Sequence, residues 1–217
     1  MRRNFEMQLE AMHTKLIQMG ALCEDAITSA AQALLDNDAA RRRKAITLER
    51  DIDMLEREIE QLCVRLLLHQ QPIASDLRRV TAAQMMIVDM ERIGDQAADI
   101  AELSEFMSGS TVKSDVHIAD MAKATAKMVT DSIDSFVRQD LNLAHSVVEY
   151  DDVVDGLFTK VKSELIDHLR ADSASAQDCL DLLMIAKYYE RIGDHAVNIA
   201  EWVVYYLTGR REVESLE

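Results

Sequence analysis

Apolar residues recur every three or four positions along most of the chain, as expected of helices that bury one face. Between residues 39 and 70 they step by three and four in strict alternation, at Ala45, Leu48, Ile52, Leu55, Ile59, Leu62 and Leu66. The same steps return between residues 141 and 170, at Val147, Tyr150, Val154, Leu157 and Val161. This spacing is typical of a coiled-coil-like seam between long helices.

Breaks in the pattern divide the chain into six predicted helices, at residues 4–36, 39–70, 74–107, 115–138, 141–170 and 175–208. Asp38 and Asp140 suit N-caps, Pro72 stops the second helix and Gly209 ends the last. Gly109 lies between two serines and indicates a flexible joint. Helices joined by such short connections are expected to pack as antiparallel neighbours.

One twelve-residue sequence motif occurs twice. "ERIGDQAADIAE" begins at Glu91 and "ERIGDHAVNIAE" at Glu190, and the two agree at nine of twelve positions with an offset of 99 (190 − 91). An internal repeat in a helical chain indicates two copies of one structural unit. We therefore predict an all-α fold of two tandem three-helix bundles of long antiparallel helices, at residues 1–110 and 111–217.

The composition agrees with a helical fold and limits the cell compartment and the partners that we expect. The 217 residues include one proline and six glycines, and 48% are hydrophobic. Cys23, Cys63 and Cys179 are scattered through apolar stretches, which is typical of reduced thiols rather than of a disulfide framework. A formal charge of −15 argues against nucleic acid as a partner. With no apolar run near the ~20 residues of a membrane span, we expect a cytoplasmic protein with at most peripheral membrane contact.

Four acidic pairs stand out, each with carboxylates at i and i+4 and therefore on one helix face about 6 Å apart. Aligning the halves on Asp38 and Asp140 shows that each half owns two such pairs. The pairs are Glu49/Asp53 and Glu91/Asp95 in the first half, and Asp151/Asp155 and Glu190/Asp194 in the second.

The positions of these pairs match across the predicted helical hairpins. Residues equally distant from the turn of an antiparallel hairpin lie at one height, because each residue rises 1.5 Å along either helix. In the first half the pairs are centred on 51 and 93, with the midpoint at Pro72. In the second half the centres are 153 and 192, and their midpoint falls in the predicted turn "RADSAS". Each half therefore should bring four carboxylates to one level.

Four crowded carboxylates repel one another, and a bound cation is the natural remedy. Oxygen ligands alone favour hard ions such as Mg²⁺, Mn²⁺, Ca²⁺ or iron, and zinc fits less well. Asp99 and Asn198 continue the two acidic stripes and are candidates for additional ligands. Because Asn198 carries a neutral amide, the second site is expected to hold one charge less.

Two glycines and two arginines repeat within the motif. Gly94 and Gly193 lie inside predicted helices, where glycine costs roughly 0.5 to 1 kcal/mol relative to alanine. Their missing Cβ atoms would admit either a metal cluster or a closely packed helix. Arg92 and Arg191 would brace the carboxylates, contact an acidic partner or simply face solvent.

At this point the sequence resembles the PhoU family of phosphate-uptake regulators. The resemblance rests on "QQPIASDLRRV" leading into "DMERIGDQAADIAE", on "LLMIAKYYERIGDHAVNIAEWVVYYLTG", and on the pairs in "ERDIDMLEREI" and "DDVVDGLFTKV". It implies tandem three-helix bundles, a tendency to form homodimers and multinuclear metal clusters on the bundle surface. Residue by residue, it assigns the eight paired carboxylates as ligands.

The same resemblance implies a function. Such a protein would be a cytoplasmic negative regulator that links the phosphate-specific ABC transporter to its sensor histidine kinase and lowers phosphate uptake when phosphate is plentiful. The residues themselves leave two alternatives. One is a carboxylate-bridged di-metal enzyme, a hydrolase or oxidase, although no nucleophile and base recur beside the motifs. The other is a helical scaffold without metal.

Overall fold

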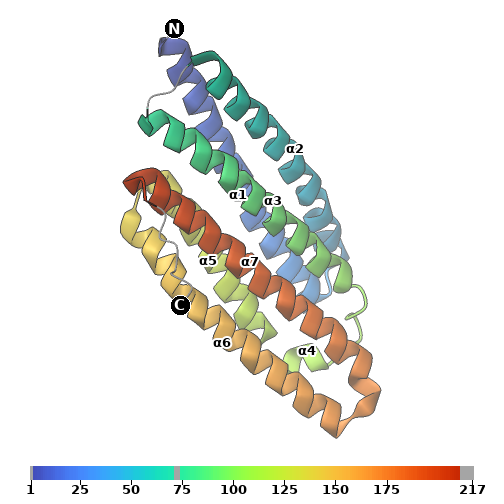
Figure 1. The fold of residues 1–217 in the computed structure, drawn as a ribbon. Helices are drawn as coiled ribbons and strands as arrows, with labels where there is room; N and C mark the ends of the chain where they lie inside the picture. Colours follow the sequence, from blue (N-terminus) through green and yellow to red (C-terminus); the bar gives the residue numbers. More distant parts are fainter. Residues whose placement is uncertain (1, 71–73, 211–217) are drawn as a thin grey trace.

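The computed structural model describes residues 2–70 and 74–210, and within them all regular secondary structure is helical (Figure 1). Pro72 lies outside the described residues. The seven α-helices are α1 Arg2–Asp36, α2 Ala39–Gln70, α3 Ala74–Leu103, α4 Val112–Asp115, α5 Ile118–Arg138, α6 Leu141–Ala171 and α7 Ala176–Thr208, with one 3-10 turn at Ser173–Ser175.

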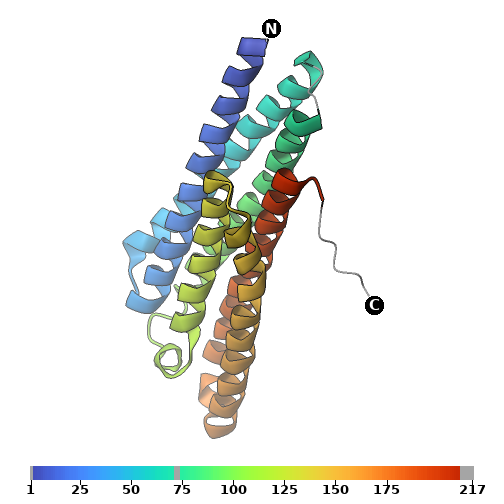
Figure 2. The same cartoon turned by 90° about the vertical axis from the view of Figure 1, so that its left-hand side faces the viewer.

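Six of these helices form two three-helix bundles, as the sequence predicts. Helices α1, α2 and α3 pack on one another, and so do α5, α6 and α7. The bundles lie side by side, with α3 against α7 and α1 against α5 (Figures 1 and 2). The prediction of an all-α fold built from two repeated bundles is therefore confirmed.

The two predicted helices that flank the joint were wrong in extent. The third ends at Leu103 rather than at 107, and turns follow it. The fourth is interrupted before Ile118, where α5 begins. There the backbone N–H of His117 donates to Glu164 Oε2 at 2.9 Å, and its Nδ1 lies 2.5 Å from Glu164 Oε1. This contact with α6 gives the N–H a partner outside the helix, and no local pattern indicates it.

The predicted caps are confirmed. Asp38 Oδ1 accepts the backbone N–H groups of Ala40 at 2.8 Å and Arg41 at 3.2 Å. These two hydrogen bonds lower the pKa of Asp38, because they favour its charged form. Asp140 accepts the N–H of Leu143 at 3.1 Å. Gly209 has a φ of 77°, the left-handed conformation that closes α7.

The regular three-and-four seams lie in one core that runs through both bundles. Five of the seven seam positions of α2 are buried, and Leu55 and Leu62 pack partly exposed against the same core. The three cysteines are buried and free, which confirms their interpretation as core thiols. Within the described residues, no helix is both long enough and apolar enough to cross a membrane.

One core residue carries a polar group that the packing leaves without a partner. Tyr189 is 0% exposed, and its hydroxyl makes no hydrogen bond to the described residues. Its counterpart in the first bundle, one repeat of 99 positions earlier, is the buried and apolar Met90.

We expect Tyr189→Phe to raise the free energy of unfolding by about 1 kcal/mol, since it removes a buried hydroxyl without a partner and keeps the ring. Urea unfolding followed by circular dichroism would measure it. Tyr189→Ala is the matched contrast and should cost about 3 kcal/mol or more, because it leaves a cavity. A clear loss of stability in the phenylalanine variant would show that the hydroxyl has a partner after all.

Candidate metal sites

The first acidic site lies between α2 and α3. A groove of about 530 Å³ runs between the two helices, and its polar lining includes Glu49, Asp95, Asp99 and Glu102 together with Arg50 and Arg92. Burial and then the carboxylates of Asp53 and Asp95 raise the pKa of Glu49. Burial and then Asp95 raise that of Glu91. The structure thus places the two predicted pairs of this half within electrostatic reach of each other across the helices.

A further carboxylate joins this site and was missed by the sequence reasoning. Glu56 lies on α2 one turn beyond Asp53, and it is among the charges that raise the pKa of Glu91. Burial and then Asp53 and Glu60 raise the pKa of Glu56 itself. The spacing from Asp53 could have indicated it. Its counterpart in the second half is Phe158 (56 + 102), so the repeat gave no signal.

The second acidic site lies between α6 and α7 and brings its four carboxylates together in the same way. Burial, followed by the carboxylates of Asp155, Asp194 and Glu190, raises the pKa of Asp151 to about 6. A Cβ atom built on Gly193 would lie 3.4 Å from Asp151 Oδ1. That distance is an ordinary van der Waals contact, so the Asp151 carboxylate lies against α7 at Gly193 without requiring a glycine there.

The glycine of the first repeat has a different neighbour. A Cβ atom on Gly94 would lie 2.9 Å from Ile52 Cδ1, which is closer than side chains normally pack. Close approach of the facing helix therefore explains Gly94. This is one of the two interpretations that the sequence suggested.

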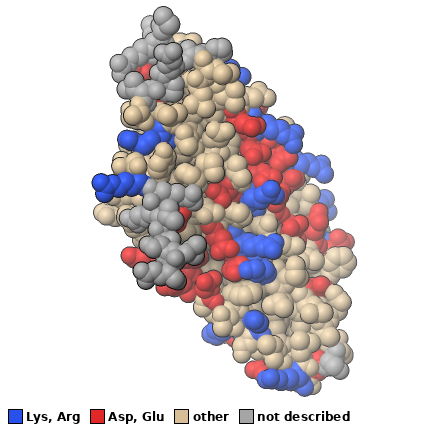
Figure 3. Space-filling model, in the orientation of Figure 1, with Lys and Arg blue, Asp and Glu red and all other residues tan. Residues whose placement is uncertain are grey.

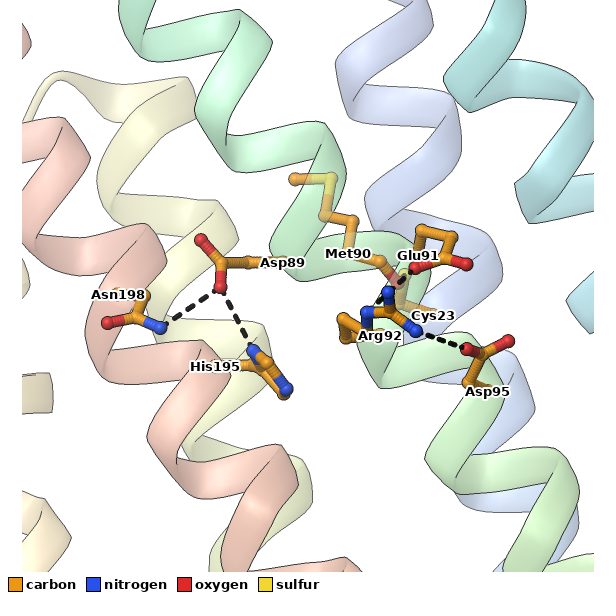
Figure 4. Close-up of polar contacts among 8 residues, drawn as sticks. All are labelled: Cys23, Asp89, Met90, Glu91, Arg92, Asp95, His195 and Asn198. Atoms are coloured by element: carbon orange, nitrogen blue, oxygen red, sulfur yellow. Dashed lines mark hydrogen bonds and ion pairs between the residues drawn. The ribbon is translucent and has the colours of Figure 1, made fainter.

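Basic side chains are already paired with several of these acids. In the first site Arg92 reaches Glu91 Oε2 at 3.4 Å and Asp95 Oδ2 at 3.2 Å, so it braces both carboxylates (Figure 4). In the second site Lys187 pairs with Glu190. Arg191 is exposed. A contact of Arg92 or Arg191 with a partner protein stays a prediction.

Whether these residues fit a metal depends on their chemistry and on their arrangement. Within the described parts of the chain, no three Asp, Glu, His or Cys side chains are already gathered as a ligand set. The donors are nonetheless carboxylates whose pKa values are raised by burial and then by neighbouring carboxylates, a charge arrangement that a hard cation would relieve. The donor set therefore fits such an ion, provided that the side chains rotate toward it.

A separate polar cluster joins the two bundles where α3 meets α7. Asp89 is only 9% exposed and accepts hydrogen bonds from His195 Nδ1 at 2.9 Å and Asn198 Nδ2 at 3.0 Å (Figure 4). Elsewhere on the same interface, Tyr188 forms a hydrogen bond with Asp99.

These two contacts are related by the internal repeat. Tyr188 corresponds to Asp89 (188 − 99) and Asn198 to Asp99 (198 − 99), so each of the two departures from strict repetition contacts the residue whose counterpart is the other departure. Sequence reasoning identified both departures but not the contacts that they make, because those contacts depend on the register of α3 against α7. Asp99 and Asn198 therefore help to join the bundles, and their role as metal ligands stays a prediction.

The comparison with known proteins follows the repeat. A sequence model of the PhoU domain matches residues 16–104 and again residues 118–203. The chain belongs to the PhoU family. It is 35% identical over 211 residues to the phosphate-specific transport system accessory protein PhoU homolog of Pseudomonas aeruginosa, a match that covers 95% of this chain and 86% of that protein.

Two solved PhoU structures share the fold. The PhoU crystal structure from Pseudomonas aeruginosa superposes with a TM-score of 0.91 at 34% identity, covering 95% of this chain and all of that one. The phosphate transport system regulatory protein PhoU from Streptococcus pneumoniae gives a TM-score of 0.84 at 27% identity, covering 96% and 99%. PhoU proteins are accessory or regulatory proteins of phosphate transport rather than enzymes. Family membership thus confirms the expectation of a non-enzymatic chain, and the di-metal enzyme alternative is set aside.

Proposed function

We propose that this protein is a cytoplasmic negative regulator of phosphate uptake and phosphate homeostasis that couples a phosphate-specific ABC transporter to the sensor histidine kinase of the phosphate-starvation response. The observation that carries the proposal is full-length similarity to proteins named as accessory or regulatory components of phosphate transport. In this proposal the protein acts as a homodimer and reaches the membrane only through its partners.

We propose further that its eight paired carboxylates hold multinuclear clusters of a hard, oxygen-preferring ion. Glu49, Asp53, Glu91 and Asp95 would serve the first bundle, and Asp151, Asp155, Glu190 and Asp194 the second. The proposal is supported by the all-oxygen donor set, and by the burial and the neighbouring carboxylates that together raise the pKa of Glu49, Glu91 and Asp151. Iron, Mg²⁺, Mn²⁺ and Ca²⁺ suit such ligands better than zinc does.

Regulation of this kind would work through docking. The face that presents α2, α3, α7 and α6 carries clusters of acidic side chains interspersed with Lys and Arg (Figure 3). A transporter or kinase domain would bind such helical faces, and metal or phosphate would shift the balance by binding one state of the protein more tightly than another. The protein itself would turn over no substrate.

Deleting the gene tests this function. We expect the deletion to raise phosphate uptake and starvation-gene expression in cells grown with ample phosphate, because the brake is lost. The unaltered gene should restore both, and a Glu190→Gln, Asp194→Asn chain should restore them poorly. Labelled phosphate uptake and a starvation-promoter reporter provide the readouts.

The same proposal makes a claim about the purified protein. If it hydrolysed phosphate esters at about one turnover per second or faster, and if the Glu190→Gln, Asp194→Asn variant lost that activity, the regulator proposal would be wrong.

A further inference from the structure

The second acidic site contains a lysine that reaches from one helix toward the other. Lys187, on α7, forms an ion pair with Glu190 on the same helix. Its Nζ also lies 5.5 Å from the ring centroid of Phe158, on the facing helix α6. The ammonium group therefore lies between a proposed ligand and an aromatic ring, and both interactions favour its positive charge.

The first bundle has neither of these two residues. Val88 corresponds to Lys187 (187 − 99), and Glu56 corresponds to Phe158 (158 − 102). At the level of Glu91, the first site thus has an additional carboxylate, whereas the second has an ammonium group held over a ring. The two repeats differ at both positions of this facing pair. In the second repeat, the lysine and the aromatic ring that replace the first repeat's residues contact each other.

Other basic residues near the acids are held differently. Among the described residues, Arg92 and Arg57 pair with acids of their own helices, as Lys187 does, but their side chains are 55% and 69% exposed. Lys187 is 39% exposed, and Glu190, its partner, is 15% exposed. Water screens the arginine pairs more than it screens the lysine pair.

We propose that Lys187 is a built-in counter-ion of the second site, which a divalent cation must displace from Glu190 before it binds there. This inference rests on the proposed metal sites. Because displacing the ammonium costs binding free energy, Lys187 weakens the second site for divalent cations. The occupancy of that site would then respond to cation concentration over a higher range than it would without the lysine.

Titration of the full-length, metal-free protein with Mn²⁺ tests the inference, using calorimetry together with the electron paramagnetic resonance signal of free Mn²⁺. A Glu91→Gln, Asp95→Asn background disables the first site, so the remaining binding reports the second. In that background Lys187→Met should tighten Mn²⁺ binding by roughly fivefold. Lys123→Met is the matched control, because it removes one exposed lysine from α5, and it should leave the affinity unchanged.

The reciprocal change uses the other repeat. In a Glu190→Gln, Asp194→Asn background, Val88→Lys should weaken Mn²⁺ binding to the first site by a similar factor. Unchanged affinity in the Lys187→Met protein, with Mn²⁺ still bound, would overturn the counter-ion role and leave the metal sites standing. Absence of Mn²⁺ binding from every form, including the unaltered chain, would overturn both.

Discussion

A variant in which all eight paired carboxylates are changed to the matching amides should retain no bound metal after purification without chelator. Amides keep the size of the side chains but remove the negative charges that a hard cation requires. The unaltered chain should carry metal in both halves, and elemental analysis by mass spectrometry measures the content. This is a complete loss, the largest functional effect that we expect.

The control keeps the eight paired carboxylates and alters four acids elsewhere. Changing the exposed Glu10, Glu105, Glu149 and Asp167 to amides should leave the metal content unchanged. The half-variant Glu91→Ala, Asp95→Ala should lose metal only from the first bundle and keep its fold. Equal metal content in the eight-site variant and the unaltered chain would remove these carboxylates from consideration as ligands.

The metal-free eight-site variant should also be at least as stable as the metal-free parent at neutral pH. Burial, followed by the neighbouring carboxylates, raises the pKa of Asp151 in the folded state to about 6, above the ~3.9 of an unfolded aspartate. Such a group favours folding only in its protonated form, so its charge opposes folding as the pH rises through this range. Amides remove that opposition, and thermal unfolding in the presence of chelator would show it.

Much of the fold and of the site could be predicted from the sequence, because the two repeats show the same pattern of helices and acidic pairs. Periodicity placed the long helices, Asp38 and Asp140 placed two starts, and the offset of the acidic pairs predicted that facing helices bring them together. Each of these features depends on local spacing or on the simple geometry of a hairpin. Such features can be recognised in a single sequence.

The features that were missed depend on contacts between distant segments. The helix break at His117 comes with a contact to Glu164 on α6, and nothing beside His117 predicts it. Glu56 has no acidic counterpart, so a search that relied on repetition passed over it. The pairing of Asp89 with Asn198 requires the register of α3 on α7, which neither half encodes alone.

That pairing predicts a large effect on stability. Asn198→Asp makes this position identical to Asp99, its counterpart in the first repeat, and would place a second carboxylate about 3 Å from the buried Asp89 carboxylate. The variant loses a hydrogen bond and gains repulsion between like charges, so we expect it to lower the free energy of unfolding by about 3 kcal/mol at pH 8. For a chain of this size the melting temperature should fall by about 6 to 12 °C.

The penalty should depend on pH in a defined direction. As the pH falls from 8 into the acidic range, one of the two facing carboxyl groups of the variant takes up a proton and can donate to the other. Repulsion is then relieved, so the variant should approach the parent at low pH and fall furthest behind it at high pH. Melting temperatures of both proteins across this range would measure the difference.

A second substitution separates the pairing from a general intolerance of aspartate at position 198. Asp89→Asn in the Asn198→Asp chain exchanges donor and acceptor and should recover most of the lost stability, because each side chain again has a partner of opposite character. Asn198→Asp without loss of stability at pH 8 would mean that the two side chains do not meet in solution. If Asn198→Asp lowers stability and Asp89→Asn does not restore it, the destabilisation comes from another part of the contact between α3 and α7. Rescue would explain why the acidic repeats differ at this position: a strict repeat would set one carboxylate against another between the two bundles.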